Sequence, residues 1–235
     1  MNIDLFNLKR ELDYFCNYYG SDFLCGFGTE EILDCFNKYF VKSKWLDLGG
    51  GSTSLLWWLA QKFNNPIDIV DISEESFFLT KILKLSNYDG GCYKYVRSNY
   101  YNKDLRHCKT KFIKQNLLSN IPLKHKYKNI SQIGLLGLCR NEKQFENILA
   151  QICGLLKENG ILISANWIFN KQYAIKRNID NTFLNQQLIQ KFVKENNLIL
   201  KYCKYVNFTN DDNYKGVIIY VIQRKKDLAK SCWHL

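Results

Sequence analysis

The chain has 235 residues, of which 46% are hydrophobic and 23% are charged. This balance indicates a globular protein with a buried core and excludes an intrinsically disordered chain. No apolar run reaches the roughly 18 residues that cross a membrane, and residues 1–10 lack the apolar segment of a secretory signal. We therefore expect one domain over residues 1–235, a cytoplasmic location, no membrane partner, and a monomer or a homodimer.

The net charge of +11 raises the question of a nucleic-acid partner. Phosphate contacts need clustered basic residues, and only residues 103–114 and Arg224–Lys226 are densely basic. Neither patch alternates basic with aromatic residues in an RNA-binding pattern. A lysine-rich composition spread over solvated faces explains the charge, so we do not expect a nucleic-acid partner.

The cysteines and histidines argue against disulfides and metal. The nine cysteines are odd in number and include no Cys-x-x-Cys pair, so we expect free thiols, most of them buried, in a reducing compartment. The three histidines are widely separated, so we expect no metal site.

Hydrophobic periodicity predicts the elements of the chain in order. Residues 1–43 form a helical cap, with helices over 4–19 and 29–40. The core, residues 44–226, alternates strands at 45–48, 67–71, 112–116, 130–136 and 161–165 with helices at 53–63, 73–85 and 142–156, before a helix at 186–196. Residues 87–111 show little periodicity and are expected to be a loop or a small excursion from the sheet.

The last two predicted strands, 198–207 and 217–223, have no helix between them, so we expect an antiparallel C-terminal hairpin. The alternation before them predicts the α/β class. We expect a doubly wound, Rossmann-like, mostly parallel seven-stranded sheet with that hairpin at one side and the N-terminal helical cap.

The turn after the first core strand is the most informative stretch for function. An apolar strand from Trp45 runs into Gly49-Gly50-Gly51, a helix follows, and the next strand ends in a carboxylate, Asp71. Glycines let the backbone approach a ligand closely, and an acid at the end of the second strand accepts hydrogen bonds from ribose hydroxyls. The pattern predicts a site for the adenosine half of a cofactor.

Two residues around this turn decide between cofactors. A dinucleotide site has a third glycine where this chain has Ser54, and Asp47, inside the end of the first strand, would repel a pyrophosphate. S-adenosylmethionine (SAM) carries an ammonium and a sulfonium but no phosphate, so carboxylates and aromatic faces suit it. We predict SAM as the co-substrate.

These residues resemble class I SAM-dependent methyltransferases, and among them the small-molecule N-methyltransferases that act on nicotinamide, phenylethanolamine, indolethylamines and thioethers. The resemblance covers nearly the whole chain. Five segments carry it in order: Asp13–Tyr19, Asp47–Thr53, Val70–Ser73, Gly154–Gly160 and Phe169–Tyr173. It implies methyl transfer to a nitrogen or sulfur atom of a small molecule, by in-line displacement at the sulfonium methyl.

The resemblance also implies a role for each matched residue. Tyr14 and Tyr19 would close over the cofactor, and Asp71 would hold the ribose with Ser76 near it. The other implied cofactor contacts are Asp47, Gly49, Gly51, Thr53, Asn116 and Leu117. Asn166 and Tyr173, with Tyr14, are the implied catalytic residues on the acceptor side.

The acceptor side departs from the family pattern. Positions where amine methyltransferases have carboxylates match Asn166 and Leu136 here, which disfavours a cationic amine and leaves a neutral heteroaromatic nitrogen, a thiol or a thioether. The same loss permits an alternative reaction, a SAM-consuming cyclase that forms azetidine-2-carboxylate and methylthioadenosine, although Asp47 near the reacting amine argues against it. An RNA methyltransferase is a second alternative, but the usual Asn-Pro-Pro-Tyr signature is absent.

Several of these residues also admit a structural interpretation. Tyr14 and Tyr19 could be core aromatics of an amphipathic helix, Asp47 could only cap the glycine turn, and Tyr173 could be an ordinary helix aromatic. The sequence leaves these alternatives open.

Overall fold

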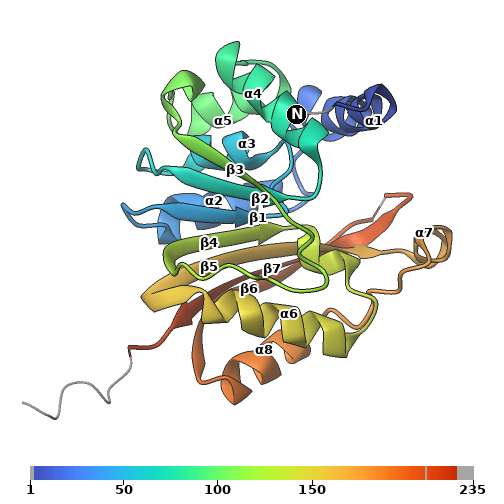
Figure 1. Cartoon of the computed structure of the whole chain (residues 1–235). Helices are drawn as coiled ribbons and strands as arrows, with labels where there is room; N and C mark the ends of the chain where they lie inside the picture. The colour runs from blue at the N-terminus through green and yellow to red at the C-terminus, as the bar shows by residue number, and fades with distance from the viewer. Residues whose placement is uncertain (1–2, 210, 227–235) are drawn as a thin grey trace, which may run out of the picture.

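The computed structural model describes residues 3–209 and 211–226, whose strands form a single sheet (Figure 1). Its seven strands are β1 (Trp45–Leu48), β2 (Ile67–Asp71), β3 (Thr110–Lys114), β4 (Tyr127–Ile133), β5 (Leu156–Phe169), β6 (Leu198–Asn207) and β7 (Tyr214–Arg224).

The strand order is β3-β2-β1-β4-β5-β7-β6. The pairs from β3 through β5 are parallel, whereas β7 is antiparallel to both β5 and β6. The predicted fold class is confirmed, because the sheet is Rossmann-like and mostly parallel and its reversed strand belongs to the C-terminal hairpin. The switch point of strand order lies between β1 and β4, where open α/β sheets bind ligands.

Helices cover both faces of the sheet, as a doubly wound fold requires (Figure 1). Helices α1 through α5 lie on one face, and α6 and α8 lie on the other. The helices are α1 (Leu5–Phe15), α2 (Thr29–Tyr39), α3 (Ser54–Ala60), α4 (Glu74–Leu85), α5 (Gly91–Asn99), α6 (Glu142–Gly154), α7 (Lys171–Arg177) and α8 (Gln186–Glu195), with a π-helical turn η1 (Cys16–Gly20) and two 3₁₀ turns, η2 (Leu105–His107) and η3 (Leu135–Leu138).

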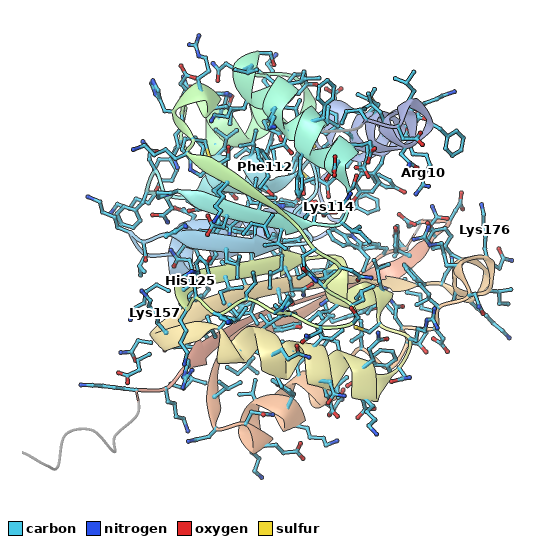
Figure 2. All side chains as sticks on the ribbon, viewed as in Figure 1. Arg10, Phe112, Lys114, His125, Lys157 and Lys176 are labelled. Atoms are coloured by element: carbon cyan, nitrogen blue, oxygen red, sulfur yellow. The ribbon has the colours of Figure 1, made fainter. Side chains whose placement is uncertain are left out.

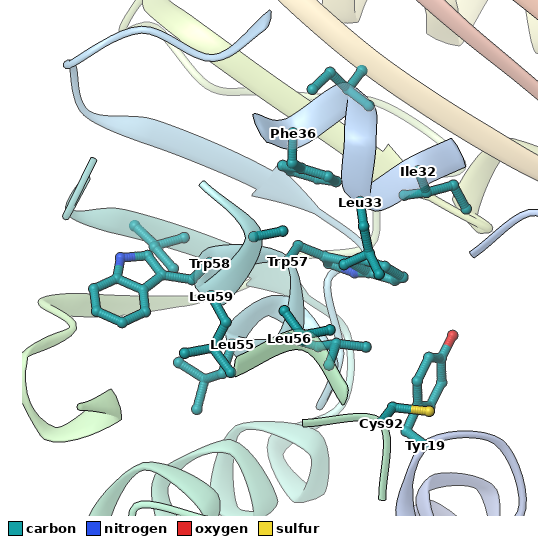
Figure 3. Packing of buried hydrophobic residues seen from close by; sticks show 14 of the residues in the cluster. Tyr19, Ile32, Leu33, Phe36, Leu55, Leu56, Trp57, Trp58, Leu59 and Cys92 are labelled. Atoms are coloured by element: carbon teal, nitrogen blue, oxygen red, sulfur yellow. The ribbon is translucent and has the colours of Figure 1, made fainter. Parts of the chain in front are cut away.

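The core beneath α2 and α3 is aromatic (Figure 3). The Trp57 ring is fully buried and stacks on Phe36, with ring centroids 5.8 Å apart and planes at 7°. Tyr19 from the N-terminal segment meets Trp57 edge-on at 6.2 Å. Such offset and edge contacts stabilise beyond the area they bury, by about 0.5–1.5 kcal/mol per pair. They fix the N-terminal segment to the helix that follows the glycine turn.

Of the two alternatives predicted for residues 87–111, a loop or a small excursion from the sheet, the loop is wrong, because this stretch contains α5. Its buried side chains, Cys92, Tyr93 and Val96, lie on one helix face, but a tyrosine-rich sequence after Gly90-Gly91 conceals that period. Gly91 has φ +52° and lies so close to the backbone of Tyr19 and Gly20 that a side chain there would overlap it. The segment packs against the N-terminal cap.

Other element boundaries differ from the prediction. β3 and β4 begin two and three residues earlier than expected, and β5 extends over Leu156–Phe169 rather than five residues. The residues added at the carboxyl end of β5, from Asn166 to Phe169, pair with β7, and Leu156 at its start pairs with Tyr127 of β4. A short helix that was not predicted, α7, follows β5.

The described cysteines are all free, and five of them are buried. Of the four that the sequence placed in apolar runs, Cys35, Cys139 and Cys153 are buried and Cys203 is half-buried, while Cys232 lies outside the described residues. None of the helices within residues 3–226 that the structure describes is long and apolar enough to cross a membrane.

Candidate functional site

The glycine turn joins β1 to α3 at the carboxyl end of the parallel strands. Gly49 (φ +67°) and Gly51 (φ +50°) adopt the left-handed conformation that favours glycine, and the Gly49 N–H donates to the Val70 carbonyl at 2.8 Å. Thr53 closes the turn, since its Oγ1 donates to the Gly50 carbonyl at 3.1 Å. The three predicted cofactor residues therefore form one rigid turn at the switch point of the sheet.

A buried carboxylate lies directly beneath this turn. Asp47 is inaccessible to solvent and accepts hydrogen bonds from Ser54 Oγ, at 2.6 Å, and from Ser131 Oγ. Burial raises its pKa to about 6, and the two serine hydroxyls oppose that shift. Ser54, in the place of the third dinucleotide glycine, thus has a definite role in holding Asp47. A Cβ at Gly50 would overlap both groups, which explains the middle glycine.

Asp71 ends β2 on the other side of the turn. Its Oδ2 accepts the Gly51 N–H at 3.0 Å and its Oδ1 accepts the Ser73 N–H at 2.9 Å. Burial raises the pKa of this carboxyl, and the backbone donors oppose the rise. Because each carboxylate oxygen can accept a second hydrogen bond, Asp71 is fixed in place with capacity left for a diol.

A second acid near Asp71 was missed by the sequence reasoning. Glu11, on α1, accepts a 3.4 Å hydrogen bond from Ser73 Oγ, and burial followed by the charge of Asp71 raises its pKa. The Asp4 N–H also donates to Glu75 Oε1 at 3.1 Å, so α1 is tied to the start of α4. A lone acid on an amphipathic helix gives no sequence signal for this placement.

The predicted cofactor residues Ser76, Asn116 and Leu117 lie at the ends of neighbouring elements. Ser76 is buried in the first turn of α4, and its Oγ donates to the Ser73 carbonyl at 2.9 Å. Asn116 is exposed just beyond β3 and accepts the Leu118 N–H at 3.1 Å, while Leu117 is buried. Since Asp71 pairs with Lys114 in the parallel ladder, these residues flank the end of β2.

Tyrosines from two distant parts of the chain meet above the carboxyl edge. Tyr14 lies 5.1 Å from Tyr18 and 6.0 Å from Tyr19, between ring centroids, and Tyr173 lies 5.6 Å from Tyr214. Tyr18 is hydrogen-bonded to Tyr214 and lies near Tyr173, and its partial burial raises its pKa. The tyrosines of the N-terminal segment are therefore in contact with Tyr173 and Tyr214. We call these five residues the tyrosine cluster. Tyr18 and Tyr214 were not predicted.

Asn166 and Leu136 are placed apart from the tyrosine cluster. Asn166 is fully buried on the strand face that Leu162 and Ile168 share, under α6 and α8. Its amide bonds to Gln132, at 3.3 Å, and to Ser164, at 3.4 Å. Leu136 is buried in the hydrophobic core on that same face of the sheet. The structure therefore brings Tyr14 and Tyr173 together but gives Asn166 a place in the core.

The hydrogen-bonding groups and charges at the carboxyl edge can be compared with those of a SAM-like ligand. The Ser52 hydroxyl, within the turn, is buried with no hydrogen-bond partner, and Asp71 retains accepting capacity. Asp47 supplies negative charge without an exposed cation beside it. These acceptors suit a diol and a cationic tail, and the lysine in register with Asp71, Lys114, is paired with Glu74 at 2.8 Å. Within the described ranges, no group of three or more metal-ligating side chains occurs.

Comparison with known proteins agrees with the Rossmann-like fold described above. No protein-family model and no curated protein matches the sequence. Solved structures do match over nearly the whole chain. A SAM-dependent methyltransferase from Clostridium acetobutylicum ATCC 824 has a TM-score of 0.59 and 14% identity, covering 95% of this chain and 100% of its own. The chain has the fold of SAM-dependent methyltransferases.

Two further structures carry named activities. N-methyltransferase NodS from Bradyrhizobium japonicum WM9, in complex with S-adenosyl-L-homocysteine, has a TM-score of 0.60 and 10% identity, covering 94% of this chain and 97% of its own. Magnesium protoporphyrin IX methyltransferase from Synechocystis PCC 6803, with bound S-adenosylhomocysteine, has a TM-score of 0.62 and 13% identity, covering 94% and 96%. At these identities the likeness is one of fold, and the narrower resemblance to small-molecule N-methyltransferases stays a prediction.

Proposed function

We propose that this chain is a SAM-dependent methyltransferase that methylates a nitrogen or sulfur atom of a small, uncharged acceptor. One observation carries the proposal. Two carboxylates, the buried Asp47 and the half-buried Asp71, flank a left-handed glycine turn at the switch point of a methyltransferase-type sheet. That arrangement offers acceptors to a ribose diol and negative charge to a cationic methionine tail.

The cofactor-binding part of the proposal assigns a task to each residue of the turn. Asp71, held by Gly51 and Ser73, accepts the ribose hydroxyls, and Asp47 lies under the turn toward the methionine side. Thr53 and the glycines line that side, Ser76 lies near the ribose, and Asn116 and Leu117 flank the adenine. Bound SAM supplies a methyl group already activated by its sulfonium, so the protein has only to position and desolvate the acceptor.

The acceptor side of the proposal rests on the tyrosine cluster. Tyr14 is 45% exposed, and its packing in the tyrosine cluster raises the pKa of its phenol above the usual 10, so it stays protonated at neutral pH and acts as a hydrogen-bond donor and wall rather than as a base. Asp211, the carboxylate near Tyr18, accepts the backbone N–H groups of Asn213 and Tyr214, each at 2.8 Å. The uncharged acceptor follows from Asn166 and Leu136, which stand where the resembled amine methyltransferases have carboxylates. Asn166 has no part in the proposed chemistry.

A product assay by mass spectrometry tests the reaction. Purified protein is incubated with SAM alone and with a panel of pyridines, thiols and thioethers. We expect S-adenosylhomocysteine only when an acceptor is present. Tyr173→Ala should lower kcat/KM for the acceptor about tenfold or more while KM for SAM stays unchanged, because the lost wall contacts only the acceptor. Tyr205→Ala, at a partly exposed tyrosine of β6, is the matched control.

Methylthioadenosine formed from SAM alone would contradict methyl transfer and favour the cyclase alternative. Unchanged turnover in Tyr173→Ala would contradict the assignment of the tyrosine cluster to the acceptor side of the site.

A further inference from the structure

A basic hollow lies at the amino edge of the sheet, opposite the edge that carries the proposed cofactor site. It has a volume of about 400 Å³. Six basic side chains line it: Lys44, Lys111, His125, Lys126, Lys128 and Lys157. Figure 2 shows His125 and Lys157 close together at this edge, away from Lys114 and Lys176.

The sequence did not reveal this cluster because its members come from separate strands. Lys44 precedes β1, Lys111 lies early in β3, Lys126 precedes β4 and Lys157 lies early in β5. Parallel strands all begin at the same edge, so the topology brings these lysines together. The antiparallel β7 ends there too, and Arg224 donates to the Leu156 carbonyl at 3.0 Å. The basic tail segment therefore adjoins the hollow.

The lining keeps a strong positive charge. Asp68 is its one carboxylate, and the five lysines against it give a formal charge of +4 with histidine neutral. Lys44 Nζ lies 2.7 Å from Asp68 Oδ2, which also accepts the Tyr127 hydroxyl at 2.7 Å. Lys128 donates to the Glu158 carbonyl and so retains its charge. Lys111, Lys126 and Lys157 are exposed, and within the described part of the chain their side chains make no hydrogen bond or ion pair.

The second carboxylate oxygen of Asp68, Oδ1, has no hydrogen-bond partner among the described residues. Asp68 is 2% exposed, and its Oδ1 is buried without a hydrogen-bond partner. A buried carboxylate oxygen without a donor is costly, so a ligand that brings a hydroxyl would stabilise it. Lys44, whose side chain is 51% exposed, lies against this carboxylate and has to move aside for a hydroxyl to reach Oδ1. The hollow thus combines cations for a phosphate with an acceptor for a hydroxyl.

We propose that this hollow binds the sugar-phosphate backbone of single-stranded RNA. Phosphodiesters supply the anions that the five lysines attract, and the ribose 2′-hydroxyl supplies the donor that Asp68 Oδ1 lacks. No exposed aromatic ring lines the hollow, since Tyr127 is buried, so base stacking adds little and binding is independent of sequence. The proposal is independent of the methyltransferase activity, because the two sites lie at opposite edges of the sheet.

A membrane surface is disfavoured as the occupant. The apolar lining residues, Ile113 and Leu123, are only half exposed, so no apolar side chain of the lining is presented for insertion between lipids. The cations also surround a concavity, which fits a chain of phosphates better than a flat layer of headgroups.

Fluorescence anisotropy with labelled oligouridylate of about 20 nucleotides tests the proposal. For four neutralised phosphates, the slope of log K against log salt is expected to be about −3. The triple variant Lys111→Gln, Lys126→Gln, Lys157→Gln should bind at least about tenfold more weakly with a shallower slope. The control triple Lys9→Gln, Lys143→Gln, Lys194→Gln removes the same charge from other exposed positions and should bind within about twofold of wild type.

Asp68 and the alternative occupant are tested in the same assay. DNA of the same length is expected to bind about threefold more weakly than RNA, because it lacks the 2′-hydroxyl. Equal weakening by both triple variants, equal affinity for DNA and RNA, or tighter binding to phosphatidylserine vesicles than to RNA would each overturn the proposal. Unchanged SAM titrations and melting temperatures of the variants show that the fold and the other edge are intact.

Discussion

Single residues at the carboxyl edge explain why the glycine turn has its particular sequence. Ser54 and Ser131 hold Asp47, and Asp71 holds the turn itself through the Gly51 N–H. The sequence indicated Asp47 and Asp71 because the first lies just inside the end of an apolar strand and the second ends the next one. It could not indicate Ser131 or Glu11, which reach these acids across other strands and helices and have no local pattern.

Asp47 makes stability depend on pH in a defined direction. Its folded-state pKa of about 6 exceeds the usual 3.8, so between these values the folded state binds more protons than the unfolded state. Its contribution to the free energy of unfolding is therefore fully present below about pH 4 and is lost as pH rises toward 6, by on the order of 3 kcal/mol. Urea unfolding of wild type and Asp47→Asn at a series of pH values measures this.

The asparagine variant cannot ionise, so the stability difference between it and wild type should change across pH 4 to 6 and level off above. A difference that stays constant over that range would show that Asp47 has an ordinary pKa in the folded protein.

At the scale of elements, α5 and the segment after it form part of the fold rather than a loop. Lys103 reaches across to the end of α3, where its Nζ donates to the carbonyls of Trp58, at 3.0 Å, Phe63, at 3.1 Å, and Gln61. Its Nζ also lies 4.6 Å from the Trp58 ring centroid. The lysine thus satisfies carbonyls at the C-terminus of α3, which immediately follows the glycine turn.

Replacing this lysine should destabilise the protein. Lys103→Met removes three hydrogen bonds to carbonyls and is expected to lower the free energy of unfolding by about 1–3 kcal/mol. Lys94→Met, at an exposed lysine of α5, is the matched control and should change it by less than about 0.5 kcal/mol. Equal urea midpoints for the two variants would show that Lys103 does not support α3.

The sequence predicted the elements best where periodicity was strong. The strands and helices from Trp45 to Leu85 lie within three residues of their predicted bounds, because apolar strands alternate there with capped helices. It failed at α5, where Tyr93 and Val96 are core residues in a polar-looking stretch, and at β5, whose start pairs with β4 and whose end pairs with β7. Such long-range pairing leaves no local signal.

At the scale of the whole molecule, one sheet separates two chemically different edges. The carboxyl edge carries acids and tyrosines, and the amino edge carries the basic hollow. The predicted seven-stranded topology was sufficient to place Asp47 and Asp71 at one edge. The tyrosine cluster and the hollow could not be predicted, because Tyr18 meets Tyr214, and Lys44 meets Lys157, only after the strands are ordered.

The central claim is that the glycine turn with Asp71 binds SAM, and calorimetric titration of SAM tests it most directly. Wild type should bind one SAM per chain, and Asp71→Asn should bind at least about tenfold more weakly, because a hydrogen bond to a charged group contributes about 1.5–3 kcal/mol. Glu195→Gln, at an exposed acid on α8, should bind as wild type does. Absence of SAM binding by wild type, or equal affinity in Asp71→Asn, would contradict the account.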